Sequence, residues 1–60
     1  MGLAKILIIE DEDSIAQLER DYLEFHQFEC DVASNGVDGY RMALSGAYDL
    51  ILLDIMLPGM

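Results

Sequence analysis

Basic residues are scarce in this chain of 60 residues, which has three lysines and arginines against twelve aspartates and glutamates, for a net charge of −9. The three are Lys5, Arg20 and Arg41. Nucleic acids and anionic membranes are bound through basic patches, so the composition argues against direct contact of these residues with either. With 53% hydrophobic residues, the chain is nevertheless expected to fold rather than to be disordered.

Cysteine and long apolar runs are also scarce. The single cysteine, Cys30, excludes an internal disulfide and a cysteine-rich metal site, fits a reducing compartment, and is interpreted as a small buried hydrophobic residue. No apolar stretch approaches the ~20 residues of a membrane span. The first residues lack the basic region and apolar core of a signal peptide. We therefore expect a cytoplasmic protein without membrane contact.

Three segments are predicted to form strands. Residues 5–9 and 50–53 are two of them. Residues 6–9 and 50–53 are continuous aliphatic runs, which are typical of parallel strands because such strands are covered on both faces. Residues 28–32 alternate apolar and polar side chains with a period of two, which predicts a half-exposed strand at the sheet edge.

An amphipathic helix is predicted between the first two strands, from about residue 14 to residue 26. Ser14 followed three residues later by Gln17 matches a capping box at its start. Its apolar stripe consists of Ile15, Leu18, Tyr22 and Phe25.

A shorter helix is predicted over residues 37–45, after the turn signal of residues 34–36. Gly46 stands at the position beyond its C-terminus, and Gly39 within it costs ~1 kcal/mol relative to alanine. The element order β-α-β-α-β with short connections predicts an α/β fold with a parallel sheet. The apolar stripe of this helix consists of Val37, Tyr40 and Leu44.

The acids that follow the two aliphatic strands form the candidate site. Glu10 and Asp11 follow the first strand, and Asp54 follows the last. In open α/β sheets, ligands bind beyond the carboxyl ends of the strands. Clustered carboxylates repel one another unless a cation neutralises them, and hard oxygen ligands favour Mg²⁺. We therefore predict a Mg²⁺-assisted phosphoryl site formed by Glu10, Asp11 and Asp54.

Three blocks of the sequence resemble the N-terminal half of a response-regulator receiver domain, the phospho-accepting module of two-component signalling. They are residues 5–12, 33–36 and 48–60, which occur in the family's order and spacing. The resemblance implies that residues 1–60 form a partial receiver domain, a truncated flavodoxin-like β-α-β-α-β unit with sheet order 2-1-3. The last block is most similar to regulators that carry a winged-helix DNA-binding domain, which implies a transcriptional regulator.

The resemblance also implies a role for each acid. Asp54 would accept a phosphoryl group from a histidine kinase and form an acyl phosphate. Glu10, Asp11, Asp54 and the backbone carbonyl of Met56 would hold Mg²⁺. Such a chain is a phospho-acceptor rather than an enzyme, with at most weak self-phosphorylation from small phosphodonors.

The sequence departs from the family pattern at three points. Glu10 stands where the family more often has aspartate. Gln27 occupies a helix-ending position usually held by glycine, which would force a left-handed conformation or a changed turn. The sequence ends at Met60, before the family's later switch residues, so we expect no signalling output from these residues alone.

Two alternative functions stay open at this point. A phosphatase of the dehalogenase type also forms an aspartyl phosphate, but it needs a second aspartate two residues after the nucleophile, where this sequence has Met56. The other alternative is a self-assembling half-domain with no retained activity. In either a receiver fragment or a half-domain, residues 50–53 would leave an open strand edge, so we expect a homo-oligomer through that edge.

Overall fold

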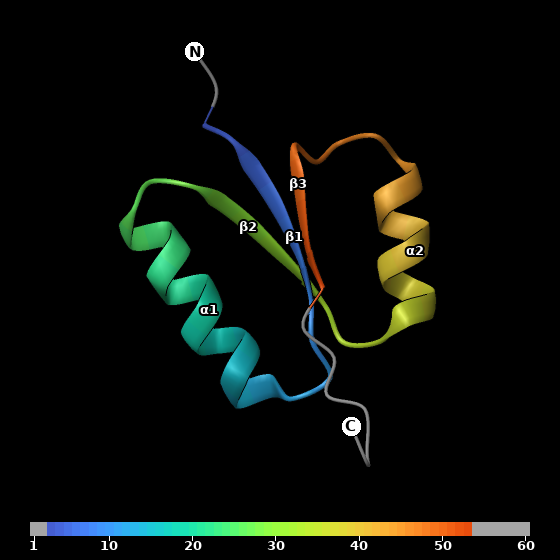
Figure 1. The fold of residues 1–60 in the computed structure, drawn as a ribbon, viewed down its shortest axis with the longest axis horizontal. Coiled ribbons are helices and arrows are strands. Elements are labelled where there is room, and N and C mark those ends of the chain that lie inside the picture. The colour runs from blue at the N-terminus through green and yellow to red at the C-terminus, as the bar shows by residue number, and fades with distance from the viewer. Residues whose placement is uncertain (1–2, 54–60) are drawn as a thin grey trace.

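The computed structural model describes residues 3–53, which form a three-stranded sheet and two helices (Figure 1). The strand order is β2-β1-β3, and both pairs of neighbouring strands are parallel. The fold class and strand order predicted from the sequence are thereby confirmed. In chain order, the elements are β1 (Lys5–Ile9), α1 (Asp13–Phe25), β2 (Glu29–Ala33), α2 (Gly36–Leu44) and β3 (Leu50–Leu53).

The core lies on the two faces of the central strand, β1. Its residues from Ile6 to Ile9 are at most 6% exposed, as the continuous aliphatic run predicted. Successive side chains of a strand point to opposite faces, so β1 serves two cores. Ile6 and Ile8 pack with Cys30 and with Leu23 of α1. Leu7 and Ile9 pack with residues that include Ala33 and, from α2, Met42 and Ala43. The helices thus cover opposite faces of the sheet (Figure 1).

Three members of the apolar stripe predicted for α1 are exposed rather than buried, although Leu18 and Tyr22 border an apolar groove together with Leu52 of β3. Leu18, Tyr22 and Phe25 are 69%, 65% and 82% exposed. The helix contacts the sheet instead through the buried Ala16 and the partly buried Leu23. A small side chain such as Ala16 lets the helix backbone approach the strands closely, which periodicity alone does not reveal.

The stripe predicted for α2 is also exposed in the described structure. Its members Val37, Tyr40 and Leu44 are 70%, 67% and 68% exposed, whereas Gly39 is buried. A Cβ atom on Gly39 would lie only 2.5 Å from Cδ1 of Ile9. Glycine is therefore present in the middle of this helix because the helix backbone lies directly against β1.

The helices begin at residues other than those expected. The N-cap of α1 is Glu12, whose side chain makes no capping hydrogen bond, and Ser14 lies inside the first turn. The predicted capping box is therefore wrong, and Gln17 Nε2 donates instead to Asp21 Oδ1 at 2.8 Å. In α2 the residue before the helix does act as a cap, because the Asn35 side chain accepts from the Asp38 N–H at 2.8 Å.

Each helix is followed, two residues after its end, by a residue with a left-handed backbone conformation. Gln27 has a φ of +70°, which confirms one of the two outcomes expected at this non-glycine position. The Phe28 N–H donates to the Leu23 carbonyl at 3.0 Å, and the Gln27 N–H donates to Glu24 at 2.9 Å, which together form a Schellman motif. Gly46, with a φ of +75°, follows α2 as predicted.

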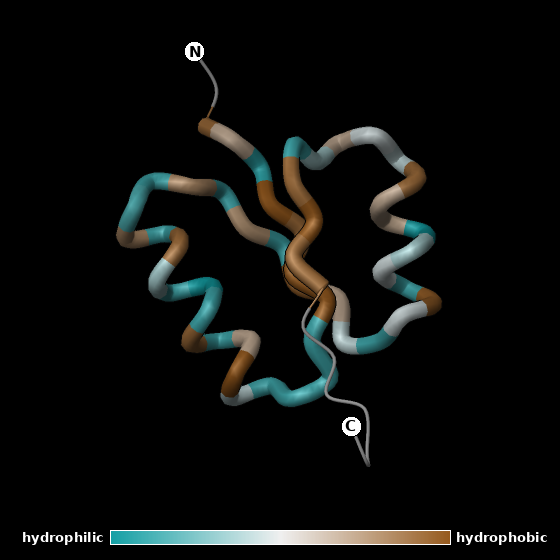
Figure 2. Tube along the Cα trace, viewed as in Figure 1, coloured by the Kyte–Doolittle hydropathy of each residue, from teal (hydrophilic) through white to brown (hydrophobic). Residues whose placement is uncertain are grey.

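β3 differs from β1 in its exposure. Leu50, Ile51 and Leu53 are 58%, 45% and 66% exposed, so the expectation of a covered strand holds for β1 but not for β3 within residues 3–53. β2 lies at the opposite edge of the sheet, as its alternating sequence predicted. Figure 2 shows the apolar strands at the centre of the molecule.

Candidate functional site

The candidate site lies where β1 and β3 end. The two strands are parallel, and their last residues, Ile9 and Leu53, are Cα partners. Both strands therefore end at the same level of the sheet. The next residues in the sequence are Glu10 and Asp54; Asp54 lies outside the described residues.

Glu10 is buried at this edge, with 1% of its surface exposed. Its backbone N–H donates to the Ala33 carbonyl at 3.0 Å, which extends the β1–β2 ladder by one hydrogen bond beyond the strand. A carboxylate is seldom buried this deeply in proteins, because removing charge from water is costly. The backbone hydrogen bond and the burial together fix Glu10 at the end of β1.

The acids that follow Glu10 are exposed. Asp11 and Glu12 precede α1, and Asp13 is its first residue. Negative charge at a helix N-terminus is stabilised by about 0.3–1 kcal/mol per residue. Asp11 is thus accessible to solvent and follows the buried Glu10 directly. A carboxylate that binds an ion from solution needs such access.

Two of the four predicted metal ligands are described. Glu10 and Asp11 are adjacent at the end of β1, whereas Asp54 and Met56 lie outside the described residues. Within residues 3–53, no group of three or more histidine, cysteine, aspartate or glutamate side chains is arranged to hold a metal. The donor types fit Mg²⁺, which commonly takes one or two protein carboxylates and keeps several waters.

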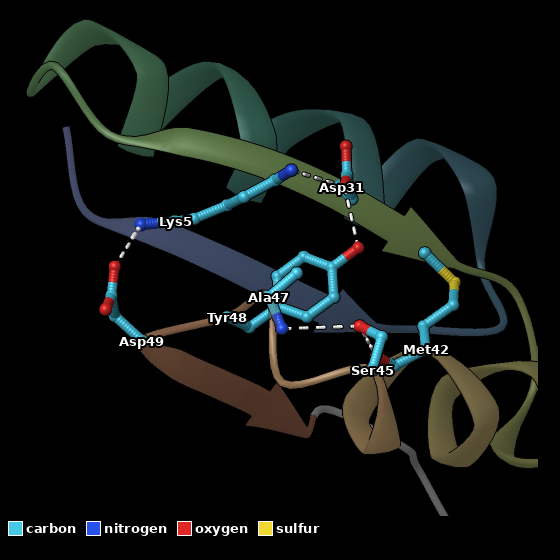
Figure 3. Close-up of polar contacts among 7 residues, drawn as sticks. All are labelled: Lys5, Asp31, Met42, Ser45, Ala47, Tyr48 and Asp49. Carbon is cyan, nitrogen blue, oxygen red and sulfur yellow. Dashed lines mark hydrogen bonds and ion pairs between the residues drawn. The ribbon is translucent and has the colours of Figure 1, made fainter. Parts of the chain in front are cut away.

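A second polar cluster lies near the edge where β1 and β3 begin, and sequence analysis missed it (Figure 3). We call Lys5, Asp31, Tyr48 and Asp49 the strand-start cluster. The Tyr48 hydroxyl donates to Asp31 Oδ2 at 2.7 Å. Lys5 Nζ lies 3.8 Å from that oxygen and 5.5 Å from the centre of the Tyr48 ring. The hydrogen bond to Asp31, assisted by burial, raises the pKa of the Tyr48 phenol above its ordinary value.

The backbone joins the other two members of the strand-start cluster. The Lys5 N–H donates to Asp49 Oδ2 at 2.8 Å, and the Asp49 N–H donates to the Lys5 carbonyl at 2.7 Å. The sequence signal for this pairing is a charged residue placed directly before each aliphatic run. That signal has little specificity, because charged residues flank most strands.

Residues 6–60 match the family model described as the response regulator receiver domain. Among curated proteins, the transcriptional regulatory protein SrrA of Staphylococcus aureus strain NCTC 8325 / PS 47 is 50% identical over 56 residues, which cover 93% of this chain and 23% of that relative. The protein of the same name from strain COL gives the same values. The chain therefore spans less than a quarter of the length of these relatives. Neither helix in residues 3–53 has the length and apolar character needed to cross a membrane.

Proposed function

Because the chain belongs to the response regulator receiver domain family, we propose that Asp54 accepts a phosphoryl group from a histidine kinase. Glu10, Asp11, Asp54 and the backbone carbonyl of Met56 would hold Mg²⁺ in this reaction. The observation that carries the proposal is the pairing of Ile9 with Leu53, which ends both acid-bearing strands at one level. The site residues after Leu53 enter the proposal through their sequence positions and the family match.

The proposed chemistry is a transfer between two nucleophiles. A carboxylate oxygen of Asp54 attacks the phosphorus of a phosphohistidine, so that a P–O bond forms while the P–N bond breaks and its electron pair returns to the imidazole. When bound, Mg²⁺ neutralises charge on the phosphoryl oxygens. Glu10 and Asp11 supply the negative charge that attracts the cation, and the burial of Glu10 limits its movement.

The relatives are named as transcriptional regulatory proteins, and we propose that this chain is part of a cytoplasmic protein of the same kind. Its charge of −9 disfavours direct contact of these residues with nucleic acid or with an anionic membrane. We propose a phospho-acceptor rather than an enzyme, with only slow labelling from small donors. The dehalogenase-type alternative has no support beyond the shared aspartyl phosphate, since position 56 is methionine.

Phosphoryl transfer can be tested on the chain with Mg²⁺ and a small acyl phosphate donor, followed by intact mass measurement. We expect the mass of one phosphoryl group to be added, and we expect the addition to disappear in Asp54→Asn or when Mg²⁺ is chelated. Asp21→Asn is the matched control, because Asp21 is an exposed aspartate on α1 away from the site. Equal labelling of Asp54→Asn and the unmodified chain would contradict the proposal.

We also propose that the 60-residue chain on its own self-associates through β3. Within residues 3–53, β3 is paired on one side only, with β1. Its other side offers unpaired backbone groups next to Leu50, Ile51 and Leu53, all of them exposed. A strand edge of this kind readily pairs with another copy, and a two-fold axis would make the two third strands antiparallel.

A further inference from the structure

The sequence of β3 does little to fix its register, although the residue that follows the strand belongs to the proposed site. Its four residues are all large and aliphatic, and the strand that it pairs with is aliphatic from Ile6 to Ile9. Sliding β3 by one residue would still pair three aliphatic residues of β1 with aliphatic residues. These would be Ile6, Leu7 and Ile8 for a slip in one direction, and Leu7, Ile8 and Ile9 for a slip in the other. The apolar pattern therefore does little to select one register, although a slip of one residue moves the chain by about 3.3 Å and reverses the faces of its side chains.

The strand-start cluster provides contacts that only one register allows. The Asp49 side chain accepts from the Lys5 N–H at 2.8 Å, while the Asp49 N–H donates to the Lys5 carbonyl at 2.7 Å. In a register slipped by one residue, Tyr48 or Leu50 would stand opposite Lys5, and neither has a carboxylate. A slip would therefore take the Asp49 carboxylate away from the Lys5 N–H, whereas the Lys5 carbonyl could still accept from the backbone N–H of another residue.

Tyr48 adds a second restraint, this time to the far edge of the sheet. Its hydroxyl reaches across β1 to Asp31 on β2 at 2.7 Å, and Lys5 Nζ lies beside the same carboxylate (Figure 3). A carboxylate acceptor makes this hydrogen bond stronger than one between neutral groups. Because the Tyr48 ring is rigid, this hydrogen bond restrains the distance between the start of β3 and β2.

We propose that Asp49 and Tyr48 are positioning residues that lock the register of β3 against β1 and thereby set the level at which the chain reaches Asp54. The role of Asp54 in this proposal rests on the proposed function, whereas the register lock of β3 against β1 does not depend on it. The position of Asp54 relative to Glu10 and Asp11 at one end of the sheet would thus depend on the polar contacts at the other end. This dependence arises because the aliphatic sequence of β3 does not by itself select one register.

The test is an NMR measurement of strand pairing in the full 60-residue chain. Backbone NOEs should join Ile6 to Leu50 and Ile8 to Leu52 in the unmodified chain. In Asp49→Ala and in Tyr48→Phe we expect a second set of resonances for residues 50–53 with NOEs shifted by one or two positions. The ratio of slipped to native pairing should rise roughly fivefold for each hydrogen bond removed.

Three comparisons make this result specific. Asp49→Asn keeps an acceptor oxygen and should restore the native register, while Asp21→Ala removes an exposed aspartate of α1 and should leave it unchanged. The β1–β2 NOEs between Ile6 and Cys30 should persist in all variants. A single native register in both Asp49→Ala and Tyr48→Phe, with only a lower unfolding midpoint, would overturn the proposal. If Asp49→Ala unfolds, the test rests on Tyr48→Phe alone, and a single native register in that variant would overturn the proposal.

Phosphoryl labelling separates this proposal from the function on which it depends. Slower labelling of Asp49→Ala, restored in Asp49→Asn, is expected. If strand pairing changes as described but Asp54 is not the labelled residue, the proposed function fails while the register lock stands. If Asp54 is labelled at the same rate in a chain with slipped pairing, the positioning role fails while the proposed function stands.

Discussion

Glu10 and Asp11 are neighbours in sequence but lie in opposite environments. Glu10 is 1% exposed at the end of β1, whereas Asp11 is exposed to solvent. This division suits a metal site at the surface, in which one carboxylate is held by the fold and the next meets the hydrated ion. Their placement at the end of a buried strand could be predicted from the sequence, because charged residues that follow an aliphatic run mark the point where a buried strand ends.

The first prediction concerns metal binding by these acids. Titration with Mg²⁺ should shift the amide resonances of residues 9–13 and 53–57 with weak affinity, because the repulsion between clustered carboxylates is relieved by the cation. The shifts should vanish in Asp11→Asn and in Asp54→Asn but persist in Asp21→Asn. Unchanged resonances in both segments at millimolar Mg²⁺ would contradict the metal site.

A second prediction concerns the ionisation of Tyr48. The Tyr48 hydroxyl donates a hydrogen bond to Asp31, so the pKa of the phenol in the folded chain is raised above the ordinary value of about 10. A raised pKa means that the contribution to the free energy of unfolding is complete below the unfolded pKa and is lost as the pH rises through the folded pKa. The difference in ultraviolet absorbance between the unmodified chain and Tyr48→Phe gives this titration, and Asp31→Asn should lower the pKa. A Tyr48 pKa at or below the ordinary value would rule out the hydrogen bond.

Gly39→Ala should destabilise the chain despite the better helix propensity of alanine. The new methyl group would meet Ile9 at 2.5 Å, and overpacking costs about 1–3 kcal/mol against a propensity gain of ~1 kcal/mol. Urea unfolding should therefore show a loss of about 1 kcal/mol. Gly36→Ala is the control, since no atom lies within 4 Å of its Cβ position, and it should be neutral or stabilising. A more stable Gly39→Ala chain would show that α2 does not lie against β1.

Secondary-structure elements were predicted more reliably than the faces they bury. The bounds of β1 and β3 were predicted without error, and those of α1, β2 and α2 to within one residue at each end. The buried faces were not predicted because the small residues Ala16, Gly39 and Ala43 lie at the contact with the sheet, next to Leu23 and Met42. Periodicity counts large apolar side chains, whereas close packing of a helix on a strand is decided by the absence of side-chain bulk.

The end of α1 allows a prediction on a whole element. Gln27 is left-handed, with φ at +70°, a conformation that costs a non-glycine residue about 1–2 kcal/mol. Gln27→Gly removes that strain but adds flexibility to the unfolded chain, so we expect a net stabilisation of about 0.5–1 kcal/mol by urea unfolding. Gln17→Gly, within α1, should instead destabilise by about 1 kcal/mol. If Gln27→Gly is destabilising by a similar amount, the left-handed turn is not the native conformation.

Taken as a whole, the described structure carries apolar surface on several sides. Besides the edge of β3, an apolar groove of about 370 Å³ lies between α1 and β3. The open edge was expected from the strand order 2-1-3 that the receiver resemblance implies, in which residues 50–53 pair with the first strand on one side only. The sequence did not predict the groove, which depends on the rotation of α1 about its axis. The groove is lined by Leu18, Glu19, Tyr22, Leu23 and Leu52.

Self-association of the 60-residue chain should therefore be measurable by sedimentation equilibrium. We expect a dimer whose thermal midpoint rises with concentration, because assembly stabilises the folded state by mass action. Ile51→Lys places a charge on the edge strand and should restore the monomer. Val37→Lys, at an exposed position of α2, should leave the dimer intact. A folded monomer with a midpoint independent of concentration would refute assembly through β3.

The central claim is that Asp54 carries the phosphoryl group, and mapping the modified residue tests it most directly. After reaction with a small acyl phosphate donor and Mg²⁺, the chain is cleaved and its peptides are fragmented in the mass spectrometer under conditions that preserve acyl phosphates. The account predicts a single phosphoryl group on Asp54, with Glu10 and Asp11 unmodified. A phosphoryl group on any other residue, or none on Asp54 in a chain that binds Mg²⁺, would contradict it.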